Sequence, residues 1–176
     1  LYGQNEGYKK QVLEEKFKKH YNENIYYYDE NEILQNEEAF FNNIFSKSFF
    51  DNEKLIIINR TTDKIRDIVK EILEKKIDDV VFVLNSAVLE KKSKLRSLFE
   101  KEKETICVPF YEDNNQTLSG IVNQFFRDAK ISISQQLINV IVERCRGDRI
   151  NLKNELEKIQ NFSKNKKKIN IEDLLK

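Results

Sequence analysis

The sequence predicts an α/β protein with a mostly parallel sheet covered by helices, followed by a small all-helical domain. Three observations support this fold class. Over roughly the first 110 residues, short apolar runs alternate with longer segments whose apolar residues recur every three or four positions. The short runs are apolar throughout, as expected for strands buried on both faces. From residue 115 onward only the helical periodicity remains, so the architecture changes there.

Composition excludes several classes of site. His20 is the only histidine, and Cys107 and Cys145 are the only cysteines. Neither a zinc site nor a histidine-based triad is indicated, so we expect no metal, no cofactor and no catalytic residue. Each cysteine fits a small buried apolar group, which suits a reduced, cytoplasmic setting.

The chain shows no sign of a membrane span, because 35% of its residues are charged and no apolar run approaches 18 residues. It contains no Met and opens on Leu1-Tyr2-Gly3, so we expect it to be a fragment. The net charge of +1 argues against a wholly basic nucleic-acid binder. From Ser132 onward, however, ten basic and six acidic residues give a net charge of +4.

The first predicted unit is a strand end at residues 1–7 with a glycine-containing turn, followed by a helix over Tyr8–Tyr21. A strand, loop and helix in this order invite comparison with a phosphate-binding loop, which needs the spacing G-x-x-x-x-G-K-[ST]. Here only three residues separate Gly3 from Gly7, and no Ser or Thr follows Lys9 or Lys10. The pattern therefore argues against nucleotide hydrolysis.

Asn24–Tyr28 is predicted as a strand whose tyrosines pack the sheet, since no basic residues interleave with them. A helix is predicted over Asp29–Ser48, and a buried strand over Leu55–Ile58 follows a turn at Asp51-Asn52.

An aromatic pair, Phe49-Phe50, directly follows the helix predicted over Asp29–Ser48. On a helical wheel Phe49 falls at the edge of the core-facing stripe and Phe50 on the far side. Two interpretations stay open. Either the helix ends near Ser48 and both rings turn inward, or the rings form an exposed anchor for a partner's pocket.

The remaining elements follow the same periodicities. Asn59 and Arg60, after the buried strand, lack the acidic groups that a nucleotide hydrolase would use there to position magnesium. The predicted helices and strands are, in order, a helix over Asp63–Lys76, a strand over Val80–Leu84, a helix over Val88–Lys103, a strand over Ile106–Phe110, and helices over Gln116–Ala129, Ser134–Arg146 and Ile150–Ser163. Ser134 is the expected N-cap and Gly147 the expected helix stop. The domain boundary is expected near Tyr111–Asn115.

The order of these motifs resembles the delta subunit of the bacterial DNA polymerase III clamp loader. No single motif is specific, but together they span nearly the whole chain. The residues that carry the resemblance are Leu1-Tyr2-Gly3, Phe49-Phe50-Asp51-Asn52-Glu53-Lys54-Leu55-Ile56-Ile57, Val81-Phe82-Val83-Leu84, Leu89-Glu90-Lys91-Lys92-Ser93-Lys94-Leu95, Ile131-Ser132-Ile133-Ser134, Gly147-Asp148, Asn154-Glu155-Leu156-Glu157-Lys158 and Ile169-Asn170-Ile171-Glu172-Asp173.

The resemblance implies a domain organisation. Residues 1–112 would form an ATPase-like (AAA-like) domain with a degenerate phosphate loop, and residues 113–176 a helical lid domain. A C-terminal collar domain, used for oligomerisation, would lie beyond Lys176.

It also implies a function. The chain would be a non-catalytic subunit of a DNA polymerase holoenzyme, which is a nucleotidyltransferase, and would help to open the sliding clamp during DNA replication. Phe49 and Phe50, with Ser48 and Asp51, would contact the clamp, although the family's pair is usually Leu-Phe. Further partners would be the other clamp-loader subunits and, within the full complex, DNA.

Two alternatives from other classes stay open. One is a nucleotide hydrolase with an unusual phosphate loop. The other is a DNA-binding module that uses the basic C-terminal third, whose affinity would fall steeply with salt.

Overall fold

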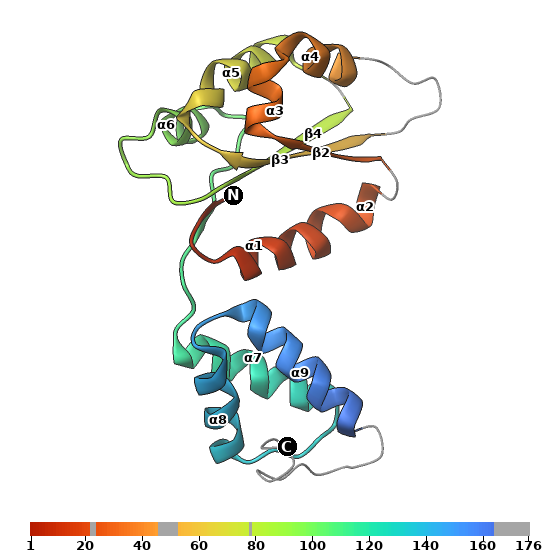
Figure 1. Cartoon of the computed structure of the whole chain (residues 1–176), viewed down its shortest axis with the longest axis vertical. Helices are drawn as coiled ribbons and strands as arrows, with labels where there is room; N and C mark the ends of the chain where they lie inside the picture. Colours follow the sequence, from red (N-terminus) through yellow and green to blue (C-terminus); the bar gives the residue numbers. More distant parts are fainter. Residues whose placement is uncertain (22–23, 46–52, 78, 164–176) are drawn as a thin grey trace. The chain divides into compact units, whose positions relative to one another are not determined.

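The computed structural model describes residues 1–21, 24–45, 53–77 and 79–163. The chain divides into two compact units, Leu1–Phe110 and Tyr111–Lys176, and each is described by itself. Figure 1 shows a sheet between helices in the first unit and a helical second unit. Within the described ranges, no helix combines the length and the apolar character needed to cross a membrane.

The first unit contains a five-stranded sheet in the order β2-β3-β4-β1-β5, and every pairing is parallel. The strands are β1 Tyr2–Gly3, β2 Ile25–Asp29, β3 Lys54–Thr61, β4 Val80–Ser86 and β5 Pro109–Phe110. The predicted fold class is confirmed. Leu55, Ile56, Ile57 and Ile58 of β3 are no more than 1% exposed, which agrees with their uniformly apolar sequence.

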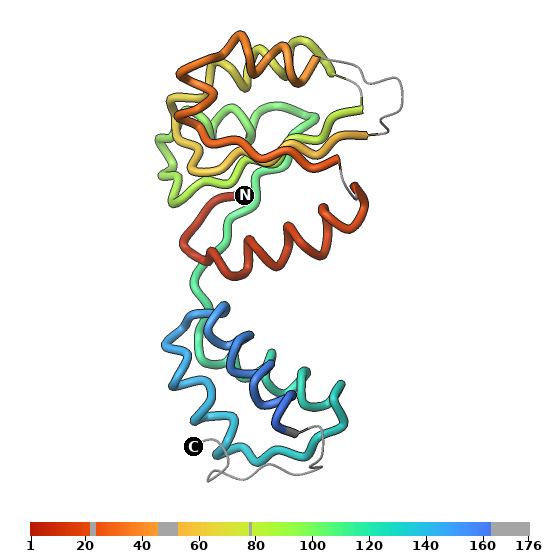
Figure 2. The backbone as a smooth tube through the Cα atoms, turned by 45° about the vertical axis from the view of Figure 1, so that its right-hand side comes forward, coloured from red at the N-terminus to blue at the C-terminus, as the bar shows by residue number. Residues whose placement is uncertain are grey.

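Helices cover both faces of this sheet (Figures 1 and 2). One face carries the continuous helical segment α1 Glu6–Val12, η1 Leu13–Lys18 and α2 Lys19–Tyr21, which packs Leu13 on Leu55, Ile57 and Val83. The other face carries α3 Glu30–Gln35, α4 Glu37–Phe45, η2 Asp63–Ile65, α5 Arg66–Lys75 and α6 Lys94–Lys101. Its core is larger and includes Phe40, Ile56, Ile58, Ile68 and Leu84.

The second unit consists, over its described residues, of α7 Asn115–Asp128, α8 Gln135–Cys145 and α9 Arg149–Ser163 around one apolar core. Ser134 caps α8 as predicted, accepting a hydrogen bond from the Leu137 N–H at 3.3 Å. Arg149 donates two hydrogen bonds to the Asp113 carboxylate, with Nε–Oδ2 2.7 Å and Nη2–Oδ1 2.5 Å, and so ties the start of α9 to the segment before α7.

The predicted continuous helix over Asp29–Ser48 is wrong in its described part. Asp29 ends β2 and caps α3 in a capping box with Glu32. Asn36 then interrupts the helix, because its Oδ1 accepts a hydrogen bond from the Ala39 N–H at 3.1 Å and starts α4. A short polar side chain that bonds to the nearby backbone competes with helical hydrogen bonding in this way.

Two other boundaries also differ from prediction. The helix predicted over Val88–Lys103 begins only at Lys94, because Ser93 caps it by accepting from the Arg96 N–H at 3.1 Å. The strand predicted over Ile106–Phe110 is reduced to Pro109–Phe110, since its neighbour β1 spans only two residues. Ile106 is accordingly 80% exposed, and Cys107 is half-buried whereas Cys145 is fully buried.

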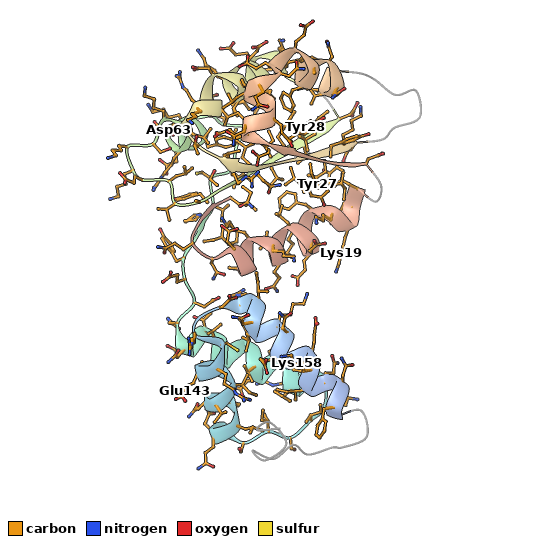
Figure 3. All side chains as sticks on the ribbon, viewed as in Figure 1. Lys19, Tyr27, Tyr28, Asp63, Glu143 and Lys158 are labelled. Carbon is orange, nitrogen blue, oxygen red and sulfur yellow. The ribbon has the colours of Figure 1, made fainter. Side chains whose placement is uncertain are left out.

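The sequence predicted that the tyrosines of β2 pack the sheet, and this is correct only in part. Tyr28 contacts Phe40 edge-on at 5.0 Å, but Tyr26 and Tyr27 are 39% and 54% exposed. Figure 3 shows Tyr27 and Tyr28 on opposite faces of the strand. Because β2 is an edge strand, Lys54 and Lys18 from other elements lie over the Tyr26 and Tyr27 rings, at 5.8 and 5.2 Å.

Candidate functional site

The carboxyl ends of the strands form the part of a parallel α/β sheet where ligands usually bind. Here the connection between β1 and α1 is short, because only Gln4 and Asn5 separate Gly3 from Glu6. Asn5 fixes this connection. Its N–H donates to the Phe110 carbonyl at 3.2 Å, and its Oδ1 accepts from the Tyr8 N–H at 3.0 Å. Two residues are too few to wrap a phosphate in backbone N–H groups.

Gly3 holds this loop against β5. Its φ is +124°, and a Cβ added there would lie 2.2 Å from the Phe110 carbonyl oxygen. Only glycine accepts both the positive φ and this close backbone approach. Gly3, which stands where a phosphate loop would begin, therefore serves packing between β1 and β5.

Lys9 is buried beneath this loop and is only 1% exposed. Its Nζ donates to the Ser86 carbonyl at 2.7 Å and to Glu6 Oε1 at 2.7 Å. A buried ammonium needs such charged and polar partners. The lysine that would face phosphates in a working loop is thus bonded within the protein. In the sequence, Lys9 stood out only as part of a spacing that does not match a phosphate loop. The one sequence signal for its ion pair was its position three residues after Glu6.

The carboxylates at the end of β2 also accept hydrogen bonds from within the protein, from groups at the end of β3. Asp29 Oδ2 accepts from Arg60 Nε at 2.5 Å, and this hydrogen bond lowers the pKa of the Asp29 carboxyl. Arg60 lies at a bulge with φ 57°. Glu30 is 4% exposed and accepts from both the N–H and the hydroxyl of Thr62, at 2.6 and 2.9 Å. These bonds fasten the β2–α3 turn to the end of β3.

Polar contacts join the ends of β3 and β4 in the same way. The hydroxyls of Thr61 and Ser86 lie 2.6 Å apart. Asp63 Oδ1 accepts from the Ser93 hydroxyl at 2.6 Å and from the Leu95 N–H at 3.0 Å. The hydrogen bond from Ser93 is the main reason that the pKa of the Asp63 carboxyl is lowered.

These contacts define what the carboxyl end of the sheet can do. Asn59 and Arg60 stand where a nucleotide hydrolase would place acidic residues, and the nearby carboxylates hold internal partners. Across the described ranges, no three His, Cys, Asp or Glu side chains are grouped so that they could hold a metal ion. The geometry gives these side chains a structural role at this end of the sheet.

The clamp-contact residues predicted from the sequence, Ser48, Phe49, Phe50 and Asp51, lie outside the described residues. Whether their rings point inward or outward therefore stays a prediction. The elements that flank them are described. α4 ends at Phe45 on one side, and β3 begins at Lys54 on the other.

The C-terminal end of α4 carries an aromatic surface next to these residues in the chain. Phe45 is 38% exposed and stacks on Phe41, with ring centroids 5.7 Å apart. Lys75 of α5 lies over both rings, with Nζ 4.6 Å from the Phe41 centroid and 4.7 Å from the Phe45 centroid. Phe40 and Ile44 face the core. This side of α4 thus presents an aromatic and cationic surface to solvent.

Comparison with known proteins supports the fold. The chain adopts an ATPase-like α/β fold followed by helices. It is similar to the Bacillus subtilis DNA clamp loader delta protein, with a TM-score of 0.65 and 15% sequence identity over 99% of this chain and 56% of that one. It is also similar to the Thermotoga maritima RuvB Holliday junction branch migration motor, with a TM-score of 0.57 and 16% identity over 99% and 58% of the two chains.

These similarities establish the fold alone, because the sequence identities are low. The chain spans little more than half the length of these solved structures. No protein-family model and no curated protein sequence matches it.

Proposed function

We propose that this chain is part of a clamp-loader delta subunit and binds the DNA polymerase sliding clamp without catalysing a reaction. The observation that carries the proposal is the similarity to the delta protein, which covers 99% of this chain and so extends over both units. Residues 1–112 would then be the ATPase-like domain and residues 113–176 the lid, with a collar domain in the remainder of the natural protein.

The choice between a clamp-loader subunit and a motor of the RuvB kind rests on the carboxyl end of the sheet. A nucleotide-driven motor needs a loop that wraps phosphates and a lysine free to neutralise them. Here the loop has two residues, and Lys9 is bonded to Ser86 and Glu6. These features favour a subunit that does not itself bind ATP. ATP-driven changes would then come from the other clamp-loader subunits.

Phe49 and Phe50 are the proposed anchors, flanked by Ser48 and Asp51. Two aromatic side chains bury about 150 Å² each, which at about 25 cal/mol per Å² corresponds to about 7.5 kcal/mol before entropic and desolvation losses. A binder that prefers the sprung form of a closed ring shifts the ring toward opening by the difference between its affinities for the two states. An anchor of this size is sufficient for such a shift.

The decisive experiment measures binding of the purified chain to the sliding clamp of the same organism by surface plasmon resonance. We expect Phe49→Ala with Phe50→Ala to weaken binding at least about 100-fold, because hot-spot aromatics dominate such interfaces. The circular dichroism spectrum should stay unchanged.

A matched control replaces two exposed aromatics of the second unit, with Tyr111→Ala and Phe162→Ala. Their side chains are 76% and 50% exposed, and clamp binding should be retained. Unchanged clamp binding by the folded Phe49/Phe50 variant would contradict the proposal. Loss of folding in that variant would instead show that the rings belong to the core.

A direct ATP-binding measurement tests the enzyme alternative. Isothermal titration of the chain with Mg-ATP should give no binding at submillimolar concentration, because the loop and Lys9 are already occupied by internal contacts. A submillimolar Kd would support a nucleotide hydrolase with an unusual loop instead.

A further inference from the structure

Two cation–aromatic pairs flank the segment that carries the proposed clamp anchors. Before this segment, the exposed ring of Phe45 at the end of α4 lies under Lys75 of α5, with Nζ 4.7 Å from the ring centroid. After it, Lys54 at the start of β3 lies over the exposed ring of Tyr26, with Nζ 5.8 Å from the centroid. Among the described residues, neither ring belongs to an apolar core of the first unit.

Both rings lie on the same side of the sheet. Tyr28 packs edge-on against Phe40 of α4, so Tyr28 lies on the face that α4 covers (Figure 1). Side chains alternate between the two faces along a strand, which places Tyr26 on the α4 face and Tyr27 on the other. Figure 3 shows Tyr27 and Tyr28 on opposite faces of β2. Because Phe45 belongs to α4, the two cation–aromatic pairs share the α4 side of the sheet.

The covalent chain holds both pairs close to the anchors, whatever the conformation of the residues between them. Phe49 follows Phe45 by four positions, and Lys54 follows Phe50 by four. A fully extended chain advances at most about 3.6 Å per residue, so four positions separate two Cα atoms by no more than about 14 Å. A partner that receives the anchors is therefore held within reach of both pairs.

The anchors by themselves are too small to form a complete interface. Two buried aromatic side chains supply about 300 Å², whereas a stable and specific interface buries about 800 Å² on each partner. A circular patch of about 800 Å² has a radius of about 16 Å. This radius exceeds the longest possible separation of Phe45 from Phe49, which is about 14 Å. An interface of ordinary size centred on the anchors thus extends over the surface that flanks them.

We propose that the two cation–aromatic pairs form a second contact with the sliding clamp, around the pocket that receives the anchors. The inference rests on the proposed function and adds to it a contact surface on the α4 side of the sheet. Aromatic rings bury a large apolar area while ordering few side-chain torsions, and each ammonium adds a donor for a carboxylate. The matching clamp surface is therefore apolar, with a carboxylate beside each ring.

Lys75 is held in position before any partner binds. Its Nζ pairs with Glu71 Oε1 at 2.6 Å and lies 4.6 Å from the centroid of Phe41, the ring on which Phe45 stacks. Because the ammonium is already placed above the rings, little side-chain freedom is lost on binding. An exposed ion pair between neighbouring turns of a helix is weak, so a clamp carboxylate can share the ammonium with Glu71.

The test measures binding of the purified chain to the sliding clamp of the same organism by surface plasmon resonance. We expect Phe45→Ala and Tyr26→Ala each to weaken binding about tenfold, as for aromatic residues beside a hot spot. The matched control is Tyr27→Ala. Tyr27 is more exposed than Tyr26, at 54% against 39%, but it lies on the opposite face of β2, so clamp binding should be retained.

Photo-crosslinking distinguishes a contact from an effect on the fold. The variant Phe45→p-benzoylphenylalanine should crosslink to the clamp on illumination, whereas Tyr27→p-benzoylphenylalanine should not. If Phe45 only supported the end of α4, no crosslinked product would form, even where Phe45→Ala weakens binding.

The outcomes separate this inference from the proposed function. If loss of the anchors weakens clamp binding but Phe45→Ala and Tyr26→Ala do not, the second contact is wrong and the proposed function stands. A crosslink from position 27 as strong as that from position 45 would also overturn the second contact. If the unaltered chain does not bind the clamp, the proposed function fails and the second contact fails with it.

Discussion

The carboxyl end of the sheet and the edge of β4 differ in how their polar groups find partners. At the carboxyl end, Lys9, Glu30 and Asp63 all bond to groups within the chain. Along β4, by contrast, mostly apolar side chains from both faces of the sheet line a groove of about 400 Å³. The comparison teaches that the end of the sheet at which nucleotides usually bind is filled by the protein itself.

The largest expected effect comes from breaking the closed carboxyl end at Gly3. Gly3→Ala places a Cβ 2.2 Å from the Phe110 carbonyl oxygen at a φ of +124°, so we expect a loss of about 4 kcal/mol in the free energy of unfolding of the first unit. Urea unfolding followed by tyrosine fluorescence measures this loss, since six of the seven tyrosines precede Tyr111.

Gly120→Ala is the matched control for this substitution. An added Cβ there meets nothing within 4 Å, and the position lies inside α7. We expect the free energy of unfolding of the second unit to rise by about 0.5–1 kcal/mol, because alanine is a better helix former than glycine. An equally tolerated Gly3→Ala would show that the β1–α1 loop can move away from β5, and the closed carboxyl end would then be in question.

A smaller loss is expected from Lys9→Met. Methionine keeps most of the side-chain volume but removes the charged donor to the Ser86 carbonyl, leaving that acceptor buried without a partner. We expect the first unit to lose about 1–3 kcal/mol in urea unfolding. Lys10→Met is the control, because Lys10 is exposed, and it should change stability by less than about 0.5 kcal/mol. Equal effects of both substitutions would argue against a structural role for Lys9.

The smallest effect sharpens the other side of the comparison and depends on pH. Burial lowers the pKa of the Leu1 amino group from 8.0 to about 6; weaker contributions come from Cys107, which raises it, and Lys9, which lowers it. Between these values the unfolded chain retains a proton that the folded chain has released. The stability of the 176-residue chain should therefore rise by about 1–2 kcal/mol from pH 6 to pH 8.

Urea midpoints across this pH range measure the rise. The chain extended before Leu1 by Val-Ile-Val-Ile should lack it, because the Leu1 nitrogen is then an amide. A rise that persists unchanged in the extended chain would assign the pH dependence to another group.

Prediction from sequence succeeded where a single periodicity dominates a segment. Leu55–Ile58 is apolar without alternation and forms the most buried strand, and the spacing of Ile65, Ile68, Val69 and Ile72 identified the helix of which α5 is the main part. It failed where one polar side chain overrides the periodicity. Asn36 and Ser93 each cap a helix that the apolar pattern alone extends past its true start.

The candidate site was predictable only in part. Sequence spacing alone showed that Gly3 to Lys10 departs from a phosphate loop, but it could not show that Lys9 is buried against the Ser86 carbonyl, which is 77 positions away in the chain. The aromatic pair Phe49-Phe50 stays a prediction, whereas the neighbouring surface of Phe41, Phe45 and Lys75 emerged only from the packing of α4 beside α5.

The sequence by itself determined the fold class, because buried parallel strands and amphipathic helices leave local periodic patterns that do not depend on their neighbours. Tertiary structure alone decided which polar groups bond to one another inside the molecule. Those bonds depend on which distant segments come into contact, as Lys9 contacts Ser86. Local sequence patterns do not show which distant segments come into contact.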